Sequence, residues 1–366
     1  MRRQTPADVR ADTAGRRPPG GRRPVRGRRG RITSLPVVVP LLFLLLLVTV
    51  CAAVAVGSVG VRPATVLDVV AHRLVGAGPP PAVMDDQIVW NLRLPRVLLA
   101  AVVGAGLAVV GVTLQATVRN PLADPYVLGV SAGAGLMAAV AITLGSAAVA
   151  GLSTSAAAFV GALVATAAVL GLSRRAGRVV PSRLILAGVT LSYLFTGATS
   201  FVIFRGSNAE AAHSVLFWLL GSLSESSWSN LSLPAAAVLI AGLCLMPRTR
   251  TLNALAAGDD AALSLGVPVH RVRLLITASL LTGVLVAVSG GIGFVGLVVP
   301  HLVRLVVGPD HRRLLPIALL VGATYLVVAD ALSRVLVRPE ELPIGIVTAV
   351  LGAPAFLWLL RRSEAS

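Results

Sequence analysis

The chain has 366 residues, of which 56% are hydrophobic and only 13% are charged, and its mean hydropathy is +0.87. A soluble domain is typically about half apolar and a quarter charged, so this composition excludes an ordinary soluble protein and predicts an all-α polytopic membrane protein. The formal net charge of +17 does not predict a nucleic-acid partner, because all 32 basic residues are Arg and eleven of them lie in residues 1–31.

Residues 1–35 form a tail that is rich in Arg, Pro and Gly and poor in apolar residues. Such a segment cannot bury enough apolar surface to offset the entropy of ordering it, so we predict a disordered tail. Residues 36–362 are predicted to form the membrane domain. Its first apolar stretch is followed by nine others and lacks a good cleavage site, so we interpret it as an uncleaved span and not as a signal peptide.

Ten hydrophobic segments are predicted in the membrane domain, since a bilayer crossing needs about 20 apolar residues. Residues 126–173 and 274–307 are each long enough for two helices; we expect the first run to break between Gly145 and Ser155 and the second at Ser289-Gly-Gly291. The six single segments are residues 36–57, 97–118, 184–204, 232–247, 314–333 and 343–360.

The arginines indicate the orientation of these segments, because cytoplasmic loops collect positive charge. With the N-terminus inside, most arginines fall on cytoplasmic segments, including residues 174–183 and 248–273. An even number of spans then places both termini in the cytoplasm.

Four motifs contain residues that a plain spanning helix would avoid, with Gly, Pro, His or charged side chains next to apolar runs. They are Leu92-Arg-Leu-Pro-Arg96, Arg119-Asn-Pro-Leu-Ala-Asp-Pro125, Gly293-Phe-Val-Gly-Leu-Val-Val-Pro-His301 continuing through Arg304 to Gly308-Pro-Asp-His-Arg312, and Glu341-Leu-Pro-Ile-Gly345. In this order, and over most of the chain, they resemble the permease family of ATP-driven importers for iron-siderophore, haem and vitamin B12, the FecCD-type or BtuC-like permeases.

The resemblance implies a type II ABC importer permease of a bacterial cytoplasmic membrane, with ten transmembrane helices in two inverted five-helix repeats. A faint internal match, Leu107-Ala-Val-Val-Gly111 against Val286-Ala-Val-Ser-Gly290, falls at the offset that such repeats require. The implied partners are a second permease subunit, cytoplasmic ABC ATPase subunits and an extracytoplasmic substrate-binding protein. A ferric siderophore is the expected substrate because it is the commonest in the family, and haem or vitamin B12 is the alternative.

The chain is expected to be a transport subunit and not an enzyme. A P-loop needs a Lys to grip phosphate, and the sequence contains none, so any ATP hydrolysis must come from another chain. Cys51 and Cys244 lie far apart in apolar segments and are interpreted as small buried hydrophobes. No disulfide, metal site or cofactor is therefore expected.

Three arginines are candidates for docking the binding protein: Arg93, Arg96 and Arg334. Each lies at the outer end of a predicted span, where an Arg often only extends its charge to the membrane surface. In the family, arginines of these motifs pair with glutamates of the binding protein. The resemblance therefore implies charge-assisted docking, which would steer association and fix its register.

The loop of residues 248–273 carries apolar residues at helical spacing, which indicates two short surface helices. A plain amphipathic loop is the alternative from the residues alone. The resemblance implies a coupling element that docks into an ATPase subunit, because the family has a similar Gly-acid-x-Ala-x-x-Leu-Gly pattern between spans six and seven. The residues of this pattern are Gly258, Asp259, Asp260, Leu265 and Gly266.

The resemblance also implies that spans five and ten line a central pathway between two permease subunits. The candidate gate lies just before span five, and small residues of the two spans are candidate pathway residues. Relatives tend to carry small hydroxyl residues at the gate, and the first two gate residues of this chain depart from that pattern. The candidates are Val180, Pro181 and Ser182 for the gate and Gly188, Gly345 and Gly352 for the pathway.

Two glycine motifs have a catalytic and a structural interpretation. Gly129-Val-Ser-Ala-Gly133 matches the nucleophile elbow of hydrolases, with Ser131 as the nucleophile, but it lies in an apolar helix where small residues allow close packing. Gly291-Ile-Gly-Phe-Val-Gly296 matches a dinucleotide-binding pattern but lacks the strand and the soluble helix that this pattern needs. We expect helix packing from the first motif and a tight turn from the second.

Asp330 alone supports an ion- or proton-coupled secondary transporter, which is the second candidate class. It lies four residues before Arg334, and residues at i and i+4 share a helix face, so a local ion pair is the alternative. His301 could ligate haem or iron, but we expect a packed or backbone-bonded His.

Overall fold

A computed structural model describes residues 35–57, 59–78, 80–175, 178–206, 208–267, 271–337 and 339–363. The predicted tail lies outside these residues, apart from Leu35. The described part is helical, except for one antiparallel pair of two-residue strands, β1 (Arg174–Arg175) and β2 (Arg178–Val179).

The described residues contain seven helical stretches that are long and apolar enough to cross a membrane, and three shorter apolar helices. Five of the long stretches each consist mainly of one long helix: α1 (Leu35–Ala55), α6 (Thr154–Ser173), α7 (Pro181–Arg205), α12 (Arg271–Ser289) and α14 (His311–Ser333). The other two join α3 (Val83–Asp86), η1 (Gln87–Arg93) and α4 (Leu94–Val118), and α9 (Trp228–Leu245), η4 (Met246–Arg248) and α10 (Thr249–Ala257). The three shorter helices are α5 (Val130–Leu144), α13 (Val295–Val307) and α15 (Ile344–Ser363).

Both double-length runs divide where the sequence predicts. Between α5 and α6 the chain makes a 3-10 turn, η3 (Ser146–Val149), flanked by the left-handed residues Gly145 and Gly151. Between α12 and α13 it turns at Gly290 and at Phe294, which is left-handed with φ of 68°. Each run therefore forms two separate helices and not one long helix.

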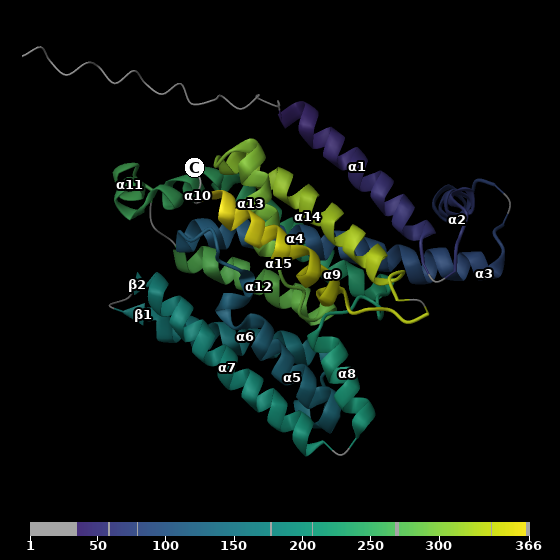
Figure 1. The fold of residues 1–366 in the computed structure, drawn as a ribbon, viewed down its shortest axis with the longest axis horizontal. Coiled ribbons are helices and arrows are strands. Elements are labelled where there is room, and N and C mark those ends of the chain that lie inside the picture. Colours follow the sequence, from purple (N-terminus) through teal and green to yellow (C-terminus); the bar gives the residue numbers. More distant parts are fainter. Residues whose placement is uncertain are drawn as a thin grey trace, which may run out of the picture. The chain divides into compact units, whose positions relative to one another are not determined.

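Helix α4 is buried along most of its length and packs against α9, α12, α13 and α14 (Figure 1). Two glycines explain how close these helices come. A Cβ atom on Gly104 would lie 2.2 Å from the carbonyl oxygen of Gly322 in α14, and one on Gly111 would lie 2.0 Å from that of Gly296 in α13. Small residues allow such backbone approach between membrane helices, so α4 forms the centre of the packed core.

Three helix ends meet at a node of glycines. The C-terminal ends of α8 (Ala209–Leu219) and α12 and the N-terminal end of α15 are joined by backbone hydrogen bonds, from Gly345 to the carbonyl of Leu220 at 3.0 Å and from Ser222 to that of Ser289 at 2.9 Å. Gly290 has a left-handed φ of 64°, and a Cβ there would lie 2.1 Å from the carbonyl of Trp218. The close approach and the backbone hydrogen bonds at this node fix the ends of α8, α12 and α15 to one another.

The structure differs from the sequence-based expectation in three places. Helices α2 (Pro63–Val75) and α8 are short and were not predicted. The second span begins at Val83 and not at residue 97, because a π-helical turn over η1 carries the helix through Pro95. The thiols of Cys51 and Cys244 are exposed, not buried, since α1 and α9 turn those faces away from the core.

Candidate functional site

The arginine cluster, Arg93, Arg96 and Arg334 with Asp330 and Glu341, joins α1, η1, α4 and α14. The last carbonyls of a helix have no partner within it and carry partial negative charge. Arg93 Nη1 donates to the carbonyl oxygens of Val54 at 3.0 Å and Ala55 at 3.2 Å, and its Nη2 donates to that of Val59.

Arg334 binds the same end of α1. Its Nη1 donates to the carbonyl of Val56 at 2.8 Å, and its Nη2 donates to that of Ala53 at 2.9 Å. Two guanidinium groups therefore cap the C-terminal end of α1 and fix it to α4 and α14.

Asp330 lies between Arg96 and Arg334 and is 0% exposed. Arg96 Nε donates to its Oδ1 at 2.9 Å, and Arg334 Nε lies 3.1 Å from its Oδ2. The predicted i, i+4 ion pair with Arg334 is thus confirmed. A carboxylate held by two cations is committed to structure, which argues against Asp330 as part of a proton pathway.

The three candidate docking arginines differ in how much of each is buried and in what each contacts. Arg93 and Arg334 are only 8% and 3% exposed, and their charges are turned toward the end of α1. Arg96 reaches the surface through Glu341, whose Oε2 accepts from Arg96 Nη1 at 2.7 Å and whose side chain is 35% exposed. Of the three arginines, Arg96 has the contact that an incoming carboxylate can most readily replace.

The candidate coupling segment forms two short helices, as predicted: α10 and α11 (Asp259–Ser264). Gly258 joins them with φ of 120° and ψ of 163°, a conformation that is essentially restricted to glycine. Gly266 closes α11 in the left-handed region with φ of 67°. Both predicted glycines are therefore required by the backbone; the side chain of Asp259 lies outside the described residues.

A hydrogen-bonded clasp, formed by Asn253, Asp310 and His311, holds α10 to the start of α14. Asn253 Nδ2 donates to Asp310 Oδ1 at 2.8 Å, and Asn253 Oδ1 accepts from the backbone N–H of His311 at 2.9 Å and lies 2.7 Å from its Nδ1. Asp310 also caps α14 by accepting from the backbone N–H of Arg312 at 3.0 Å. The hydrogen bond from Asn253 holds the pKa of Asp310 below its ordinary value.

The two coupling helices differ in how much of them is buried. Leu252 and Leu255 of α10 are 0% exposed, so this helix belongs to the core. In contrast, Leu263 and Leu265 at the end of α11 are 63% and 69% exposed. The buried helix α10 therefore supports α11, whose leucines Leu263 and Leu265 form an exposed apolar surface.

The three candidate gate residues lie at the start of α7. Val180 is the extended residue before the helix, and its N–H donates to the carbonyl of Ser173 at 3.2 Å. Pro181 takes the first helical position, where its missing N–H costs no helix hydrogen bond. Ser182 is exposed. Strand β2 ends directly before Val180, so the candidate gate residues lie between the β1–β2 strand pair and a long apolar helix.

The three candidate pathway glycines are contact points inside the subunit. A Cβ on Gly188 would lie 1.7 Å from the carbonyl oxygen of Val127, one on Gly345 would lie 2.1 Å from that of Leu220, and one on Gly352 would lie 2.5 Å from Phe294 Cβ. The structure does not bring these glycines together. They fix α7 and α15 to the core, and the opposite faces of those helices are free to line a pathway.

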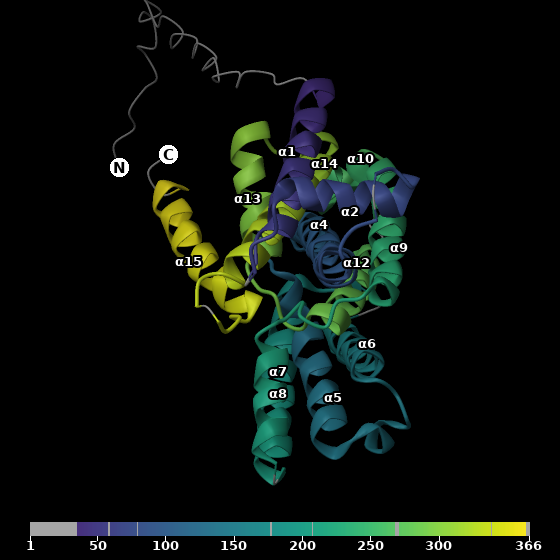
Figure 2. The ribbon, with the colours of Figure 1, turned by 90° about the vertical axis from the view of Figure 1, so that its right-hand side faces the viewer.

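Helix α7 shows an unusually large exposed apolar face for a helix of a compact unit. Helix α7 lies at the lower end of the ribbon in Figure 2. Its exposed large side chains extend over most of its length: Leu186, Val189, Tyr193, Leu194, Phe201 and Phe204. Helix α15 also exposes large apolar side chains, among them Val350, Leu357 and Trp358. These two faces are the surfaces that lipid or a second subunit would cover.

The glycine motifs serve packing, as expected. A Cβ on Gly133, beside Ser131, would lie 2.5 Å from the carbonyl of Gly161 in α6. The segment from Gly291 to Gly296 forms the turn between α12 and α13. His301 lies in α13, and the described residues contain no group of three or more His, Cys, Asp or Glu side chains that could hold a metal ion.

Sequence reasoning missed two functional candidates, Tyr126 and Asn253. The hydroxyl of Tyr126 donates to the carbonyl of Ile292 at 2.8 Å and accepts from its N–H at 2.7 Å, which fixes the turn between α12 and α13. Asn253 is a polar residue among apolar ones in α10, and that contrast was the only signal in the sequence. The partners of both residues lie far along the chain, so spacing alone could not identify them.

Comparisons with known proteins agree with this architecture. The FecCD transport family matches residues 45–362. The cobalamin import system permease protein BtuC of Halobacterium salinarum is 44% identical over 279 residues, which are 76% of this chain and 74% of that protein. The hemin transport system permease protein HmuU of Yersinia pestis is 44% identical over 282 residues, 75% of this chain and 84% of that protein. A solved inward-facing structure of a metal-chelate type ABC transporter superposes with a TM-score of 0.77 at 33% identity, over 89% of this chain and 99% of that one.

Proposed function

We propose, from the premise that this chain belongs to the FecCD transport family, that it imports a preassembled metal chelate. As a member of that family it is an ABC importer permease, a multi-pass membrane subunit. The observation that carries the proposal is the family match over residues 45–362, joined to a coupling segment whose backbone is built around Gly258.

The proposed topology has ten spans in two inverted five-helix repeats, with both termini in the cytoplasm of a bacterial cell. Seven long apolar helical stretches and three shorter apolar helices among the described residues support the count. The shorter helix α5 follows a segment that contacts α4, and the shorter helix α13 follows the turn after α12. Many transporters contain discontinuous helices of this kind. The arginine distribution supports the orientation.

We propose that α10 and α11 transmit the movements of a separate ATPase subunit. The exposed Leu263 and Leu265 would enter an apolar groove of that subunit, and the clasp would pass the displacement to α14. Support comes from the contrast between the buried leucines of α10 and the exposed leucines of α11. The sequence contains no Lys and therefore no P-loop lysine, which supports an ATPase on another chain.

We propose that an extracytoplasmic binding protein docks at the arginine cluster. A carboxylate of that protein would compete with Glu341 for Arg96, whereas Arg93 and Arg334 would hold the end of α1 in the geometry that docking needs. The exposure of Glu341 and the burial of Arg334 support this division. In this proposal only Arg96 exchanges its partner, from Glu341 to a carboxylate of the binding protein, although all three arginines were expected to face that protein.

We propose that the faces of α7 and α15 opposite their packed glycines meet a second permease subunit around the pathway, with Val180, Pro181 and Ser182 as the gate. Large exposed apolar side chains on both helices support this. Such a pathway would be wide and largely neutral, as a bulky chelate requires if it is not to be gripped tightly.

The substrate class is a metal chelate: ferric siderophore, haem or cobalamin. Relatives named for cobalamin and for hemin import support cobalamin and haem. Ferric siderophore rests on the resemblance described from the sequence motifs. The test is uptake by the reconstituted complex of the permease, its ATPase and its binding protein, with each labelled chelate offered in turn. ATP-dependent uptake of one chelate supports the proposal; uptake of none, with a correctly assembled complex, contradicts it.

A further inference from the structure

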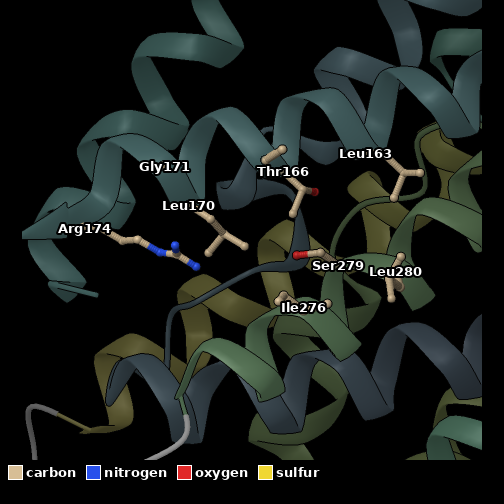
Figure 3. Close-up of a pocket in the computed structure, with 9 residues that line it drawn as sticks. Leu163, Thr166, Leu170, Gly171, Arg174, Ile276, Ser279 and Leu280 are labelled. Carbon is tan, nitrogen blue, oxygen red and sulfur yellow. The ribbon is translucent and has the colours of Figure 1, made fainter. Parts of the chain in front are cut away.

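A groove of about 440 Å³ opens between α6 and α12, and Arg174 at one end of it pairs with Val179, next to the candidate gate residue Val180. Both helices belong to membrane-spanning stretches. Apart from two hydroxyls and one guanidinium, the residues that line the groove are apolar or glycine (Figure 3): Leu163, Ala167, Leu170, Gly171, Ile276 and Leu280. Lipid therefore has direct access to a recess that the helices do not fill.

Two buried hydroxyls line this groove. Thr166 of α6 and Ser279 of α12 are 8% and 1% exposed, and neither hydroxyl has a hydrogen-bond partner among the residues that the structure describes. Figure 3 shows them on the two opposite walls of the groove. A buried polar group without a partner costs about 1–3 kcal/mol, so both hydroxyls call for an acceptor from outside the chain.

Neighbouring hydroxyls show what the usual solution would be. On the same two helices, Ser173 donates to the carbonyl of Leu170 at 3.0 Å, and Thr282 donates to that of Ala278 at 2.8 Å. Most Ser and Thr side chains in helices satisfy themselves in this way. The two groove hydroxyls make no such bond, although they line an open groove where an acceptor from outside the chain could reach them.

A positive charge lies at one end of the groove. The exposed Arg174 ends α6, lines the groove and extends along it toward Leu170 (Figure 3), and it makes no ion pair within the described chain. Arg273, also exposed, lies one turn before Ile276 of α12, so the same end of the second helix is basic as well. By helix rise, Thr166 is about 12 Å from the level of Arg174, a distance that the long Arg side chain shortens.

We propose that this groove binds one anionic phospholipid. Its phosphate would pair with Arg174, its ester carbonyls would accept hydrogen bonds from Thr166 and Ser279, and an acyl chain would fill the apolar recess. Arg174 lies at one end of the groove, the two hydroxyls lie further along it, and apolar side chains line the recess between and beyond them. The groove is separate from the faces of α7 and α15 proposed for the second subunit, so this inference does not rest on the proposed transport function.

The test measures lipid retention by the full chain purified in detergent, using native mass spectrometry with palmitoyl-oleoyl phosphatidylglycerol or phosphatidylcholine added at matched concentrations. We expect one phosphatidylglycerol to stay bound and phosphatidylcholine to be lost. Because an Arg near the surface contributes about a five-fold preference for anionic lipid, Arg174→Gln should weaken retention by about that factor. The exposed Arg183 at the start of α7 gives the matched control, Arg183→Gln, which should change nothing.

Two further variants separate the lipid from a folding defect. A Cβ atom on Gly171 would meet no atom within 4 Å, so the backbone there has room for a side chain, and Gly171→Leu should occupy the groove and abolish retention. The double variant Thr166→Val with Ser279→Ala should also weaken retention, whereas Thr282→Val, which removes a hydroxyl already bonded within its helix, should not.

Three results would overturn the proposal. Equal retention of both lipids that Arg174→Gln leaves unchanged would show no anionic site. Displacement of the bound lipid by glycerol phosphate at the same concentration would show that the acyl chain is not recognised. Efficient disulfide cross-linking of Ala167→Cys to another protein chain would show that a protein helix, and not lipid, occupies the groove.

Discussion

Asn253 Oδ1 accepts a hydrogen bond from the backbone N–H of His311 at 2.9 Å, and this contact ties the coupling helix α10 to the first turn of α14. Movement of α10 must therefore reach α14, which also carries Asp330 and Arg334 of the arginine cluster at its other end. One helix thus connects the coupling segment to the end of the molecule where docking is proposed.

Replacing Asn253 should uncouple ATP hydrolysis from transport. Asn253→Ala removes both the donor to Asp310 and the acceptor for His311, and leaving such groups unsatisfied costs about 1–3 kcal/mol. We expect the assembled complex to retain ATPase activity while chelate uptake falls about ten-fold or more, since 1.4 kcal/mol corresponds to that factor. Ser264→Ala on the exposed surface of α11 is the control. Equal loss of both activities in Asn253→Ala would indicate failed assembly.

The same substitution should change the pH dependence of stability. The pKa of Asp310 is held below its ordinary value, chiefly by the hydrogen bond from Asn253. A carboxylate with a depressed folded pKa adds stability above its unfolded pKa of about 3.9, and that stability is lost as the pH falls through the folded value. The fall in thermal unfolding temperature between pH 6 and the acid limit should therefore be smaller in Asn253→Ala than in the unmodified chain. An identical fall would separate Asp310 from this contact.

A bulky residue at Gly258 should disrupt the coupling segment. The backbone there has φ of 120° and ψ of 163°, and forcing another residue into such a region costs about 1–3 kcal/mol. Gly258→Leu should leave the permease inserted but reduce ATPase binding, measured by co-purification. Gly242 lies in α9 with open space around it, so Gly242→Leu is the matched control. Normal ATPase binding by Gly258→Leu would mean that the bend is not part of the contact.

Charge reversal at Arg96 should weaken docking of the binding protein. Truncating a desolvated charge pair costs about 2–5 kcal/mol and a rim pair far less, so we expect a partial loss of affinity that is larger at low salt. Arg205→Glu, at the exposed end of α7, is the control. Glu341→Ala frees Arg96 and should leave affinity equal or raised; a loss of affinity in Glu341→Ala would make Glu341, and not Arg96, the docking residue.

Removing Arg334 should act on stability before docking. It would leave the buried Asp330 with one cation and would expose the end of α1, and breaking a buried ion pair costs about 3–5 kcal/mol. Arg334→Ala should lower the thermal unfolding temperature of the detergent-purified chain even without any partner. An unchanged unfolding temperature together with lost docking would contradict this prediction and would indicate that Arg334 contacts the binding protein directly.

Local patterns predicted most of the fold. Runs of apolar residues located the long apolar helices, and Gly145 and Gly290 marked the breaks because turns need residues that tolerate unusual backbone angles. The two helices of the coupling segment followed from helical spacing and from Gly258. Helices α2 and α8 were missed because they are short and only moderately apolar, so no membrane-length signal marks them.

The site was less predictable because its geometry depends on contacts between distant segments. Nothing near Arg93 in the sequence shows that it binds carbonyls of Val54 and Ala55, nearly forty residues away. Asp330 and Arg334 were correctly paired, since four residues on one helix are neighbours. Arg96, however, reaches Asp330 across 234 positions, and only the packing of α4 against α14 reveals that contact.

The most direct test of the account is chelate uptake into proteoliposomes that contain this chain, its ATPase and its binding protein, with ATP or an imposed proton gradient as the only energy source. We predict uptake with ATP, none with the gradient, and none when either partner is left out. Uptake driven by the gradient in the absence of ATP would contradict this prediction and would make the chain an ion-coupled transporter.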